Sequence, residues 1–304
     1  MVSSKKKHIA KRVPRRKQSA TNNGVVTAAV WAQLNHLFDE KNWSRNIAEW
    51  SCFMRFGRTL AKLPLTEQLF LIELTKRFDY IHCGFYHDEL RKPVEELLKH
   101  RVGKIIFVGC LSEEDVKKGS IKSCKEVLYR FKGTAMATDF GLDNSIVFEN
   151  VKKIPDSYIR ALNGNEATLV FVDDFIGTGD TAHKALEYLR KVQPNLSNWE
   201  NICFLSIATL QEGLKNLEGN GFKVYTSRVY QKGISEYYKG KELEDSINKM
   251  TKIESLIKVP KSLHFGYKQS EALVCMERCP NNTFPVYWRG EKDAPFVRRY
   301  ISLS

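Results

Sequence analysis

Two adjacent acids, Asp173 and Asp174, end a run of apolar residues and precede a loop rich in glycine and threonine. Such an apolar run is typical of a buried parallel strand, and open α/β sheets bind ligands at the carboxyl ends of their strands. Ionised carboxylates only accept hydrogen bonds, so the two acids suit vicinal ribose hydroxyls or a hydrated metal ion. The segment therefore predicts a ligand site that begins where a strand ends.

The loop after the acids has the composition of an anion-binding turn. Gly177 and Gly179 let the backbone approach an anion closely and tolerate positive φ angles. Thr178 and Thr181 add hydroxyl donors, and Thr181 is expected to cap an amphipathic helix that runs from there to Val192. The N–H groups at the start of that helix would face the same anion. We therefore expect the hydroxyls of the ligand at the acids and its phosphate at the loop.

Asp180 is the residue of the loop that suits a phosphate least, because two negative charges repel each other. We expect its side chain to turn outward. The ordinary alternative for the whole segment is a strand–turn–helix unit in which aspartate and threonine serve only as turn and cap residues. Two acids followed by Thr-Gly-x-Thr are much more specific than a lone glycine-rich loop, which favours a ligand site.

Residues 172–181, Val-Asp-Asp-Phe-Ile-Gly-Thr-Gly-Asp-Thr, resemble the phosphoribosyl-pyrophosphate (PRPP) motif of type I phosphoribosyltransferases. The resemblance implies that Asp173 and Asp174 are the catalytic acids and contact the ribose 2′- and 3′-hydroxyls. It also implies Mg²⁺ as a cofactor that reaches these acids indirectly, through the ligand. The residues that it implies for PRPP and phosphate binding are Ile176, Gly177, Thr178, Gly179, Asp180 and Thr181.

The composition is typical of a water-soluble protein. With 304 residues, of which 42% are hydrophobic and 27% charged, the chain can bury a full α/β core. No apolar run is long enough to cross a membrane, and the N-terminus lacks the apolar region of a secretory signal, so we expect a cytoplasmic protein with no membrane partner. The seven cysteines form no Cys-x-x-Cys pair, and we expect them to be reduced. Oligomerisation is left open.

Positive charge is concentrated at the N-terminus of a chain with a net charge of +13. Positions 1–20 contain no acid and many basic residues: Lys5, Lys6, Lys7, Lys11, Arg12, Arg15, Arg16 and Lys17. Residues 1–24 are therefore predicted to be a disordered basic arm. The arm would contact nucleic-acid phosphates in a salt-sensitive and sequence-independent manner. A nuclear import signal and a solvated tail without a partner are the alternatives.

Two regions of different periodicity follow the arm. Between residues 25 and 100, apolar residues such as Trp31 and Leu34 recur at helical spacing and predict a helical extension. Its many aromatic residues are expected in the core rather than on a base-stacking surface. Over residues 101–304, strand and helix patterns alternate, which predicts a parallel sheet with right-handed crossovers. The C-terminal end of this domain is expected to form an acceptor or hood segment.

The positioning elements can be placed along the second region. The predicted strands of the sheet are Lys104–Gly109, Thr134–Thr138, Ile146–Phe148, Thr168–Val172, Ile202–Ala208 and Phe222–Arg228. Helices are predicted at Ser123–Phe131 and in the charged stretch 235–259. Ala272–Glu277 and Thr283–Trp288 are predicted as further strands. The resulting fold class is an α/β, type I phosphoribosyltransferase-like parallel sheet flanked by helices, with an N-terminal helical extension.

A transferase that uses PRPP must also hold pyrophosphate, and such an anion needs backbone amides and cations after the first strand. The loop after Gly109 instead begins with acids at 113–115 and is a poor anion site. We therefore assign the pyrophosphate to the basic stretch beyond it, at Ser120, Lys122 and Ser123. A solvated lysine cluster is the alternative. The acids Glu113, Glu114 and Asp115 could help to hold Mg²⁺, although a solvated acidic turn is the more ordinary interpretation.

The segment 279–289, Cys-Pro-Asn-Asn-Thr-Phe-Pro-Val-Tyr-Trp-Arg, combines a turn composition with aromatic residues. It could line an acceptor pocket, with the candidates Asn282, Tyr287, Trp288 and Arg289. Alternatively, the segment closes the core with Phe284 and Trp288.

Together with residues 119–123 and the helical extension, this segment looks like PRTase-CE, the phosphoribosyltransferase-like family of bacterial conflict and antiphage systems. Some members of that family stand beside retron reverse transcriptases. The resemblance implies a toxic effector that modifies or depletes a nucleotide, a nucleic acid or another host target. It also implies a reverse transcriptase–msDNA complex as a candidate partner of the basic arm.

Three functions remain open. The first is a Mg²⁺-dependent enzyme in which a nucleophile attacks C1′ of the ribose as pyrophosphate departs, with catalysis by positioning and electrostatic stabilisation. The second is a non-catalytic sensor that binds PRPP or a nucleotide and regulates a partner. The third is a nucleic-acid-binding protein whose α/β domain is a scaffold. His183 is expected on the helix surface or in the core rather than as a base.

Overall fold

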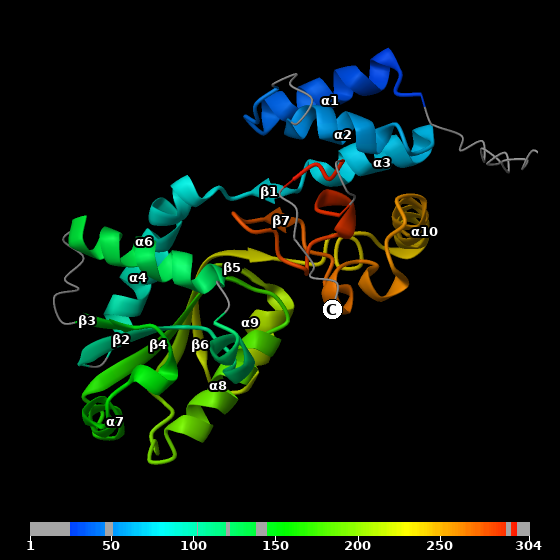
Figure 1. Cartoon of the computed structure of the whole chain (residues 1–304). Helices are drawn as coiled ribbons and strands as arrows, with labels where there is room; N and C mark the ends of the chain where they lie inside the picture. Colours follow the sequence, from blue (N-terminus) through cyan, green and yellow to red (C-terminus); the bar gives the residue numbers. More distant parts are fainter. Residues whose placement is uncertain are drawn as a thin grey trace, which may run out of the picture.

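Five parallel strands form a sheet in the lower half of the molecule in Figure 1. The computed structural model describes residues 25–45, 51–101, 103–119, 122–137, 145–289 and 293–296. The predicted basic arm, residues 1–24, lies outside the described residues. In the order β3-β2-β4-β5-β6, the strands are Ser145–Phe148, Lys104–Gly109, Ala167–Ile176, Ile202–Leu210 and Lys223–Tyr230.

Helices cover both faces of the sheet, because its central strands β2, β4 and β5 are apolar on both sides. They are α4 (Tyr86–His100), α6 (Ser123–Ala137), α7 (Asp156–Asn163), α8 (Asp180–Val192) and α9 (Gln211–Gly219). The central strand β4 shows the alternation. Val170 and Val172 pack with α4 and α6 on one face, whereas Leu169 and Phe171 pack with α7, α8 and α9 on the other. The carboxyl end of β4 therefore emerges between two helical layers.

A separate core joins the N-terminal helices to the C-terminal segment, which lie side by side in Figure 1. The helices are α1 (Ala28–Glu40), α2 (Cys52–Leu60) and α3 (Leu65–Thr75), and α10 (Gly240–Leu256) packs on the same core. Phe284, Tyr287 and Trp288 belong to this core. A two-stranded parallel sheet, β1 (Asp79–Tyr80) with β7 (Val274–Cys275), links the same two parts of the chain.

Short elements complete the described structure. They are η1 (Cys83–Phe85), α5 (Glu113–Lys117), η2 (Val151–Lys153), η3 (Lys261–Leu263), η4 (Tyr267–Gln269) and η5 (Pro285–Tyr287). None of the helices in the described ranges is both long and apolar enough to pass through a lipid bilayer.

The parallel sheet, its flanking helices and the helical part before it confirm the predicted α/β fold class. Three predicted strands need correction. The predicted strand Thr134–Thr138 is instead part of α6 as far as Ala137. The helix preference of Ala-Met-Ala prevails there over the strand preference of threonine. Thr283–Trp288 contains the 3₁₀ helix η5, because Pro285 fixes φ and cannot donate to a strand ladder. Only part of the predicted strand Ala272–Glu277 forms a strand: Val274–Cys275 is β7 and pairs with β1, and Ala272 makes an isolated bridge with Thr283.

Candidate functional site

The two acids lie within β4 rather than after it. The strand continues to Ile176, because β5 also continues, and Asp173 stands in register with Ser206 and Ile176 with Thr209. Asp174 is buried, with 4% of its surface exposed. Its backbone N–H donates a hydrogen bond of 3.0 Å to Oδ1 of Asp173. The sheet thus holds the two carboxyl groups rigidly beside each other.

The electrostatics of this pair are unfavourable for two free carboxylates. Burial raises the pKa of Asp173 well above its ordinary value, and the neighbouring Asp174 charge raises it further. Burial also raises the pKa of Asp174, although a hydrogen bond with Ser123 opposes the shift. Hydroxyl donors or a cation placed against these oxygens would stabilise their charge. The pair is therefore suited to a ligand that brings such groups.

The loop between β4 and α8 presents backbone amides to the same region. Gly179 adopts φ 89° and is the N-cap residue of α8, which begins at Asp180. The prediction that Thr181 caps this helix is therefore wrong: it lies inside the first turn and its side chain is exposed. A glycine offers no side chain to cap the first N–H groups of α8, so an anion can take that place.

Asp180 turns toward the C-terminal segment. The Tyr267 hydroxyl donates a hydrogen bond of 2.9 Å to its Oδ2, and Lys268 Nζ lies 2.6 Å from the same oxygen. Burial raises the pKa of this carboxyl, but the hydrogen bonds from Lys268 and Tyr267 outweigh it, so the net pKa is lowered. Part of the repulsion between this acid and a bound anion is thereby neutralised.

Helix α9 packs against the loop between β4 and α8. A Cβ atom on Gly213 would lie 2.1 Å from the carbonyl oxygen of Gly177, so only glycine permits this approach. Asn216 Nδ2 donates a hydrogen bond of 3.0 Å to the Thr178 carbonyl, and its Oδ1 lies 3.1 Å from His183 Nε2. His183 thus helps to hold the loop from the helix surface. The sequence contains no local signal for the role of Asn216.

These elements surround a pocket of about 290 Å³. Its lining includes the strand end and loop from Asp173 to Ala182, with three cations and part of the C-terminal segment: Lys122, Lys184, Arg278, Tyr267, Pro280, Asn281 and Asn282. Ser123 and Cys110 also line it. The pocket therefore unites the predicted motif with Lys122 and Ser123 from the start of α6.

Several lining residues were not predicted. Lys184 follows the motif on α8 and could have been suspected from its charge, whereas Arg278, Tyr267 and Asn281 carry no local signal. Asn282 was predicted and lines the pocket, where it approaches Gly177 so closely that a Cβ atom there would lie 2.4 Å from the Asn282 side chain.

The other predicted acceptor residues lie elsewhere. Tyr287 and Trp288 are 0% and 1% exposed and belong to the core with the N-terminal helices. The Tyr287 hydroxyl lies 3.0 Å from Thr75 Oγ1, and Trp288 Nε1 donates to the Thr283 carbonyl. Arg289 follows them and is outside the pocket lining. The alternative that this segment closes the core describes these side chains correctly.

The region after β2 is a short helix rather than an open anion loop. Ser112 and Asp115 form a capping box at the start of α5. Its acids are paired with lysines: Glu113 with Lys191 at 2.8 Å, Glu114 with Lys118 at 2.6 Å, and Asp115 with Lys122 at 2.7 Å. Lys122 thus lines the pocket but already forms an ion pair with Asp115. The third pyrophosphate candidate, Ser120, lies outside the described residues.

Comparison with known proteins gives a family match. Residues 65–299 match the family described as PRTase-CE. The search of curated proteins finds no match. Among solved structures, the chain is similar to the crystal structure of orotate phosphoribosyltransferase from Aeropyrum pernix, with 14% sequence identity and a TM-score of 0.30 over 48% of this chain and 70% of that one. Because the family match extends over more than half of its length, the chain belongs to the PRTase-CE family of phosphoribosyltransferase-like proteins.

Proposed function

We propose that the pocket binds PRPP or a related nucleotide and that the protein transfers its ribosyl or phosphoribosyl group. One observation supports this above the others: an acid pair, with Asp174 buried and Asp173 partly buried, and the uncapped start of α8 line the same pocket. Carboxylates accept hydrogen bonds from sugar hydroxyls, and a helix N-terminus attracts phosphate. A ribose 5-phosphate carries both groups at opposite ends.

Different residues of the pocket would contact different groups of the ligand. Asp173 and Asp174 would take the ribose 2′- and 3′-hydroxyls, and the loop Gly177–Thr181 would surround the 5′-phosphate. The lining cations Lys122, Lys184 and Arg278 would oppose the charge of the diphosphate arm. Ser123 would assist Lys122 through its hydroxyl.

A Mg²⁺ ion fits this set of donors. Burial raises the pKa of both acids, and the Asp174 charge raises that of Asp173 further, so a divalent cation beside them would stabilise their ionised form. Their oxygens are the donor type that Mg²⁺ prefers. When it arrives with the diphosphate, the ion would supply electrostatic stabilisation of the leaving group.

The proposed reaction is a substitution at C1′ of the ribose. The bond from C1′ to the pyrophosphate oxygen breaks, its electron pair leaves with pyrophosphate, and a nucleophile forms the new bond to C1′. The lining cations would stabilise the charge that develops on the leaving oxygen, and the acids would hold the sugar in place. In an antiphage setting, such transfer to a nucleotide, nucleic acid or host target would make the protein a toxic effector, with the basic arm contacting a nucleic acid or a reverse transcriptase–msDNA complex.

A non-catalytic sensor of PRPP or a nucleotide is the second candidate, and α5 favours it. The region after β2 carries three acids where a leaving-group site needs amides and cations, and one of them already pairs with Lys122. Such a protein would bind the ligand and release no pyrophosphate.

The test is calorimetric titration of the full chain with PRPP and Mg²⁺, combined with a pyrophosphate-release assay with and without cell extract. We expect binding in the micromolar range, and a loss of at least about 100-fold in the variant that combines Asp173→Asn with Asp174→Asn, because amides place N–H groups against hydroxyl donors. Binding without release in any extract supports the sensor and contradicts the transferase. Absence of binding by PRPP and by nucleotides contradicts both.

The matched control is Asp245→Asn, which removes one acid from the exposed face of α10. It should bind PRPP like the wild type. A variant that lacks residues 1–20 tests the arm separately: lost nucleic-acid affinity with retained PRPP binding would assign that role to the arm alone.

A further inference from the structure

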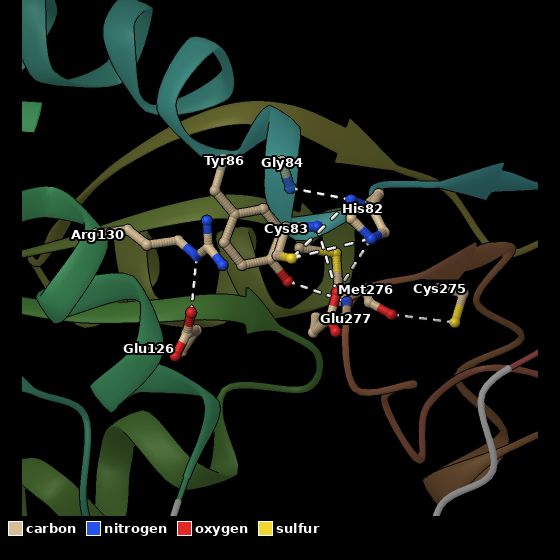
Figure 2. A network of polar contacts seen from close by, with 9 residues as sticks. All are labelled: His82, Cys83, Gly84, Tyr86, Glu126, Arg130, Cys275, Met276 and Glu277. Atoms are coloured by element: carbon tan, nitrogen blue, oxygen red, sulfur yellow. Dashed lines mark hydrogen bonds and ion pairs between the residues drawn. The ribbon is translucent and has the colours of Figure 1, made fainter.

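A second group of polar side chains lies where the segment before α4 meets the segment after β7 (Figure 2). His82 precedes η1, Cys83 begins it, and Glu277 follows β7. They offer an imidazole, a thiol and a carboxylate whose ligand atoms all lie within 4.8 Å of one another. Within the described ranges, no other three side chains of this kind meet so closely.

The separations approach those of a tetrahedral metal site. His82 Nε2 lies 3.8 Å from Glu277 Oε2 and 4.0 Å from Cys83 Sγ. Zinc–nitrogen and zinc–oxygen bonds of about 2.05 Å and a zinc–sulfur bond of about 2.3 Å place N and O about 3.3 Å apart, and N and S about 3.6 Å apart. The two distances from His82 Nε2 exceed these values by about half an ångström, and the third pair, Cys83 Sγ and the Glu277 carboxylate, lies within 4.8 Å. Rotation of the exposed His82 and Glu277 side chains would bring the three ligand atoms around one ion.

The backbone around the cluster is already fixed. Ile81 N donates a hydrogen bond of 2.8 Å to the Cys275 carbonyl, next to the β1–β7 pairing. Glu277 N donates to the Tyr86 hydroxyl at 3.1 Å, as Figure 2 shows. His82 and Glu277 are 52% and 48% exposed at their side chains, so an ion can reach them from solvent. A preorganised backbone with accessible ligand atoms favours binding.

We propose that His82, Cys83 and Glu277 bind one Zn²⁺ or a chemically similar divalent transition-metal ion. One nitrogen, one sulfur and one oxygen form a borderline-soft ligand set that suits zinc, whereas Mg²⁺ and Ca²⁺ need more oxygen ligands. Three protein ligands leave the fourth position to water. Binding replaces the Cys83 S–H bond with a metal–sulfur bond and releases one proton. The ion would tie the segment before α4 to the one that leads into Arg278 and the pocket.

The imidazole must change its tautomer on binding. Gly84 N donates a hydrogen bond of 3.1 Å to His82 Nδ1, so the neutral ring carries its proton on Nε2, on the side of Glu277. A metal ion at Nε2 moves that proton to Nδ1 and ends the Gly84 hydrogen bond. The loss of one such bond is small beside three metal–ligand bonds. The exchange provides a signature that a purely structural cluster would not show.

The test uses the full chain, stripped of metal, kept reduced and titrated with Co²⁺ as a spectroscopic substitute for Zn²⁺. We expect one equivalent to bind, with a thiolate-to-cobalt charge-transfer band in the near ultraviolet and intense visible bands typical of four-coordination. Zn²⁺ should abolish both signals by displacement. Cys83→Ser should remove the charge-transfer band and lower the Zn²⁺ affinity by at least about tenfold.

Cys52→Ser is the matched control, because Cys52 and Cys83 are the two described thiols that are not fully buried. It should keep the band and the affinity of the wild type. If Cys83→Ser fails to fold, as judged by circular dichroism, His82→Ala and Glu277→Gln provide the same readout and should each weaken binding. A wild type without the band, a band that survives in Cys83→Ser, or an unchanged Zn²⁺ affinity in both other variants overturns the proposal.

Discussion

The pocket has two walls that are built in different ways. The strand-end wall, residues 173–182, is one continuous strand, turn and helix start. The C-terminal wall combines residues from separate stretches: Tyr267, Arg278, Pro280, Asn281 and Asn282. In the first wall, the positive φ angle falls on a glycine, Gly179. Around the second, positive φ angles fall also on larger residues: Phe265, Lys268, Gln269 and Glu271.

A positive φ angle at a residue with a side chain costs about 1 kcal/mol, so surrounding contacts must hold it. Phe265 N donates to both carboxylate oxygens of Glu254, a buried acid of α10, at 3.2 and 3.0 Å. Glu271 accepts hydrogen bonds from the backbone of Ile234 and Ser235. A turn made of glycine can be read from local sequence, whereas a turn held by distant carboxylates cannot.

The largest expected effect concerns the distant anchor of the C-terminal wall. Burial raises the pKa of Glu254 from 4.5 to about 8, and the Glu271 charge contributes, while the Phe265 hydrogen bond opposes the shift. The folded state therefore holds this proton more tightly than the unfolded state, so the stabilisation is complete below pH 4.5 and is lost as pH rises through about 8. We expect wild-type unfolding free energy to fall by about 5 kcal/mol over this range, at about 1.4 kcal/mol per pKa unit.

Glu254→Gln should show a much flatter profile, because a neutral amide oxygen can still accept from Phe265 at every pH. Chemical denaturation at a series of pH values measures this. Glu244→Gln, on the exposed side of the same helix, should retain the wild-type slope. Equal slopes in all three proteins would contradict the anchoring role of Glu254.

The second prediction concerns whether the strand-end wall also depends on α9, which lies outside its own segment. Gly213→Ala would place a Cβ atom 2.1 Å from the Gly177 carbonyl oxygen, so we expect destabilisation by about 2 kcal/mol and weaker PRPP binding. Gly219→Ala on the same helix meets open space and should stabilise slightly, because alanine favours a helix. Thermal melts of the two variants decide the question. Like effects in both would show that loop support from α9 is unimportant.

The third prediction concerns the contact between the walls. Gly177→Ala forces its Cβ against the Asn282 side chain, which is itself held by a hydrogen bond of 2.8 Å to Ser270. We expect a cost of about 1 to 2 kcal/mol. Asn282→Ala removes the obstacle, so the double variant should recover part of that cost, with a coupling of about 1 kcal/mol in a double-mutant cycle. Strict additivity would mean that the walls do not touch at this point.

The smallest expected effect concerns the ion pair between Asp180 of the strand-end wall and Lys268, which follows Tyr267 of the C-terminal wall. Lys268→Gln leaves Asp180 without its cation, but Lys268 is exposed and Asp180 only partly buried, so PRPP affinity should change by less than about threefold. The net pKa of Asp180 is lowered, so the pair contributes above the ordinary pKa of aspartate and its contribution is lost as the solution is acidified. The effect should disappear at high salt. A large, salt-independent loss of affinity would show that Lys268 contacts the ligand itself.

Much of the strand-end wall could be predicted because its signals are local. The apolar run before Asp173 and the glycines at 177 and 179 act within a few residues of themselves. The position of the strand end could not be predicted, because it depends on hydrogen bonds to β5 as far as Thr209. The helical start at Asp180 instead of Thr181 likewise follows from the backbone of Gly179.

By itself, the sequence determined the parallel strands and the acid pair with its loop, since alternation, turn chemistry and helix preference are properties of neighbouring residues. Only the tertiary structure decided which parts of the C-terminal segment face the pocket. Asn282 reaches Gly177, whereas Tyr287, a few residues later, is buried against Thr75 of α3. The local sequence does not determine whether an aromatic or amide side chain faces the pocket or the core, because the residues that pack against it lie far away in the chain.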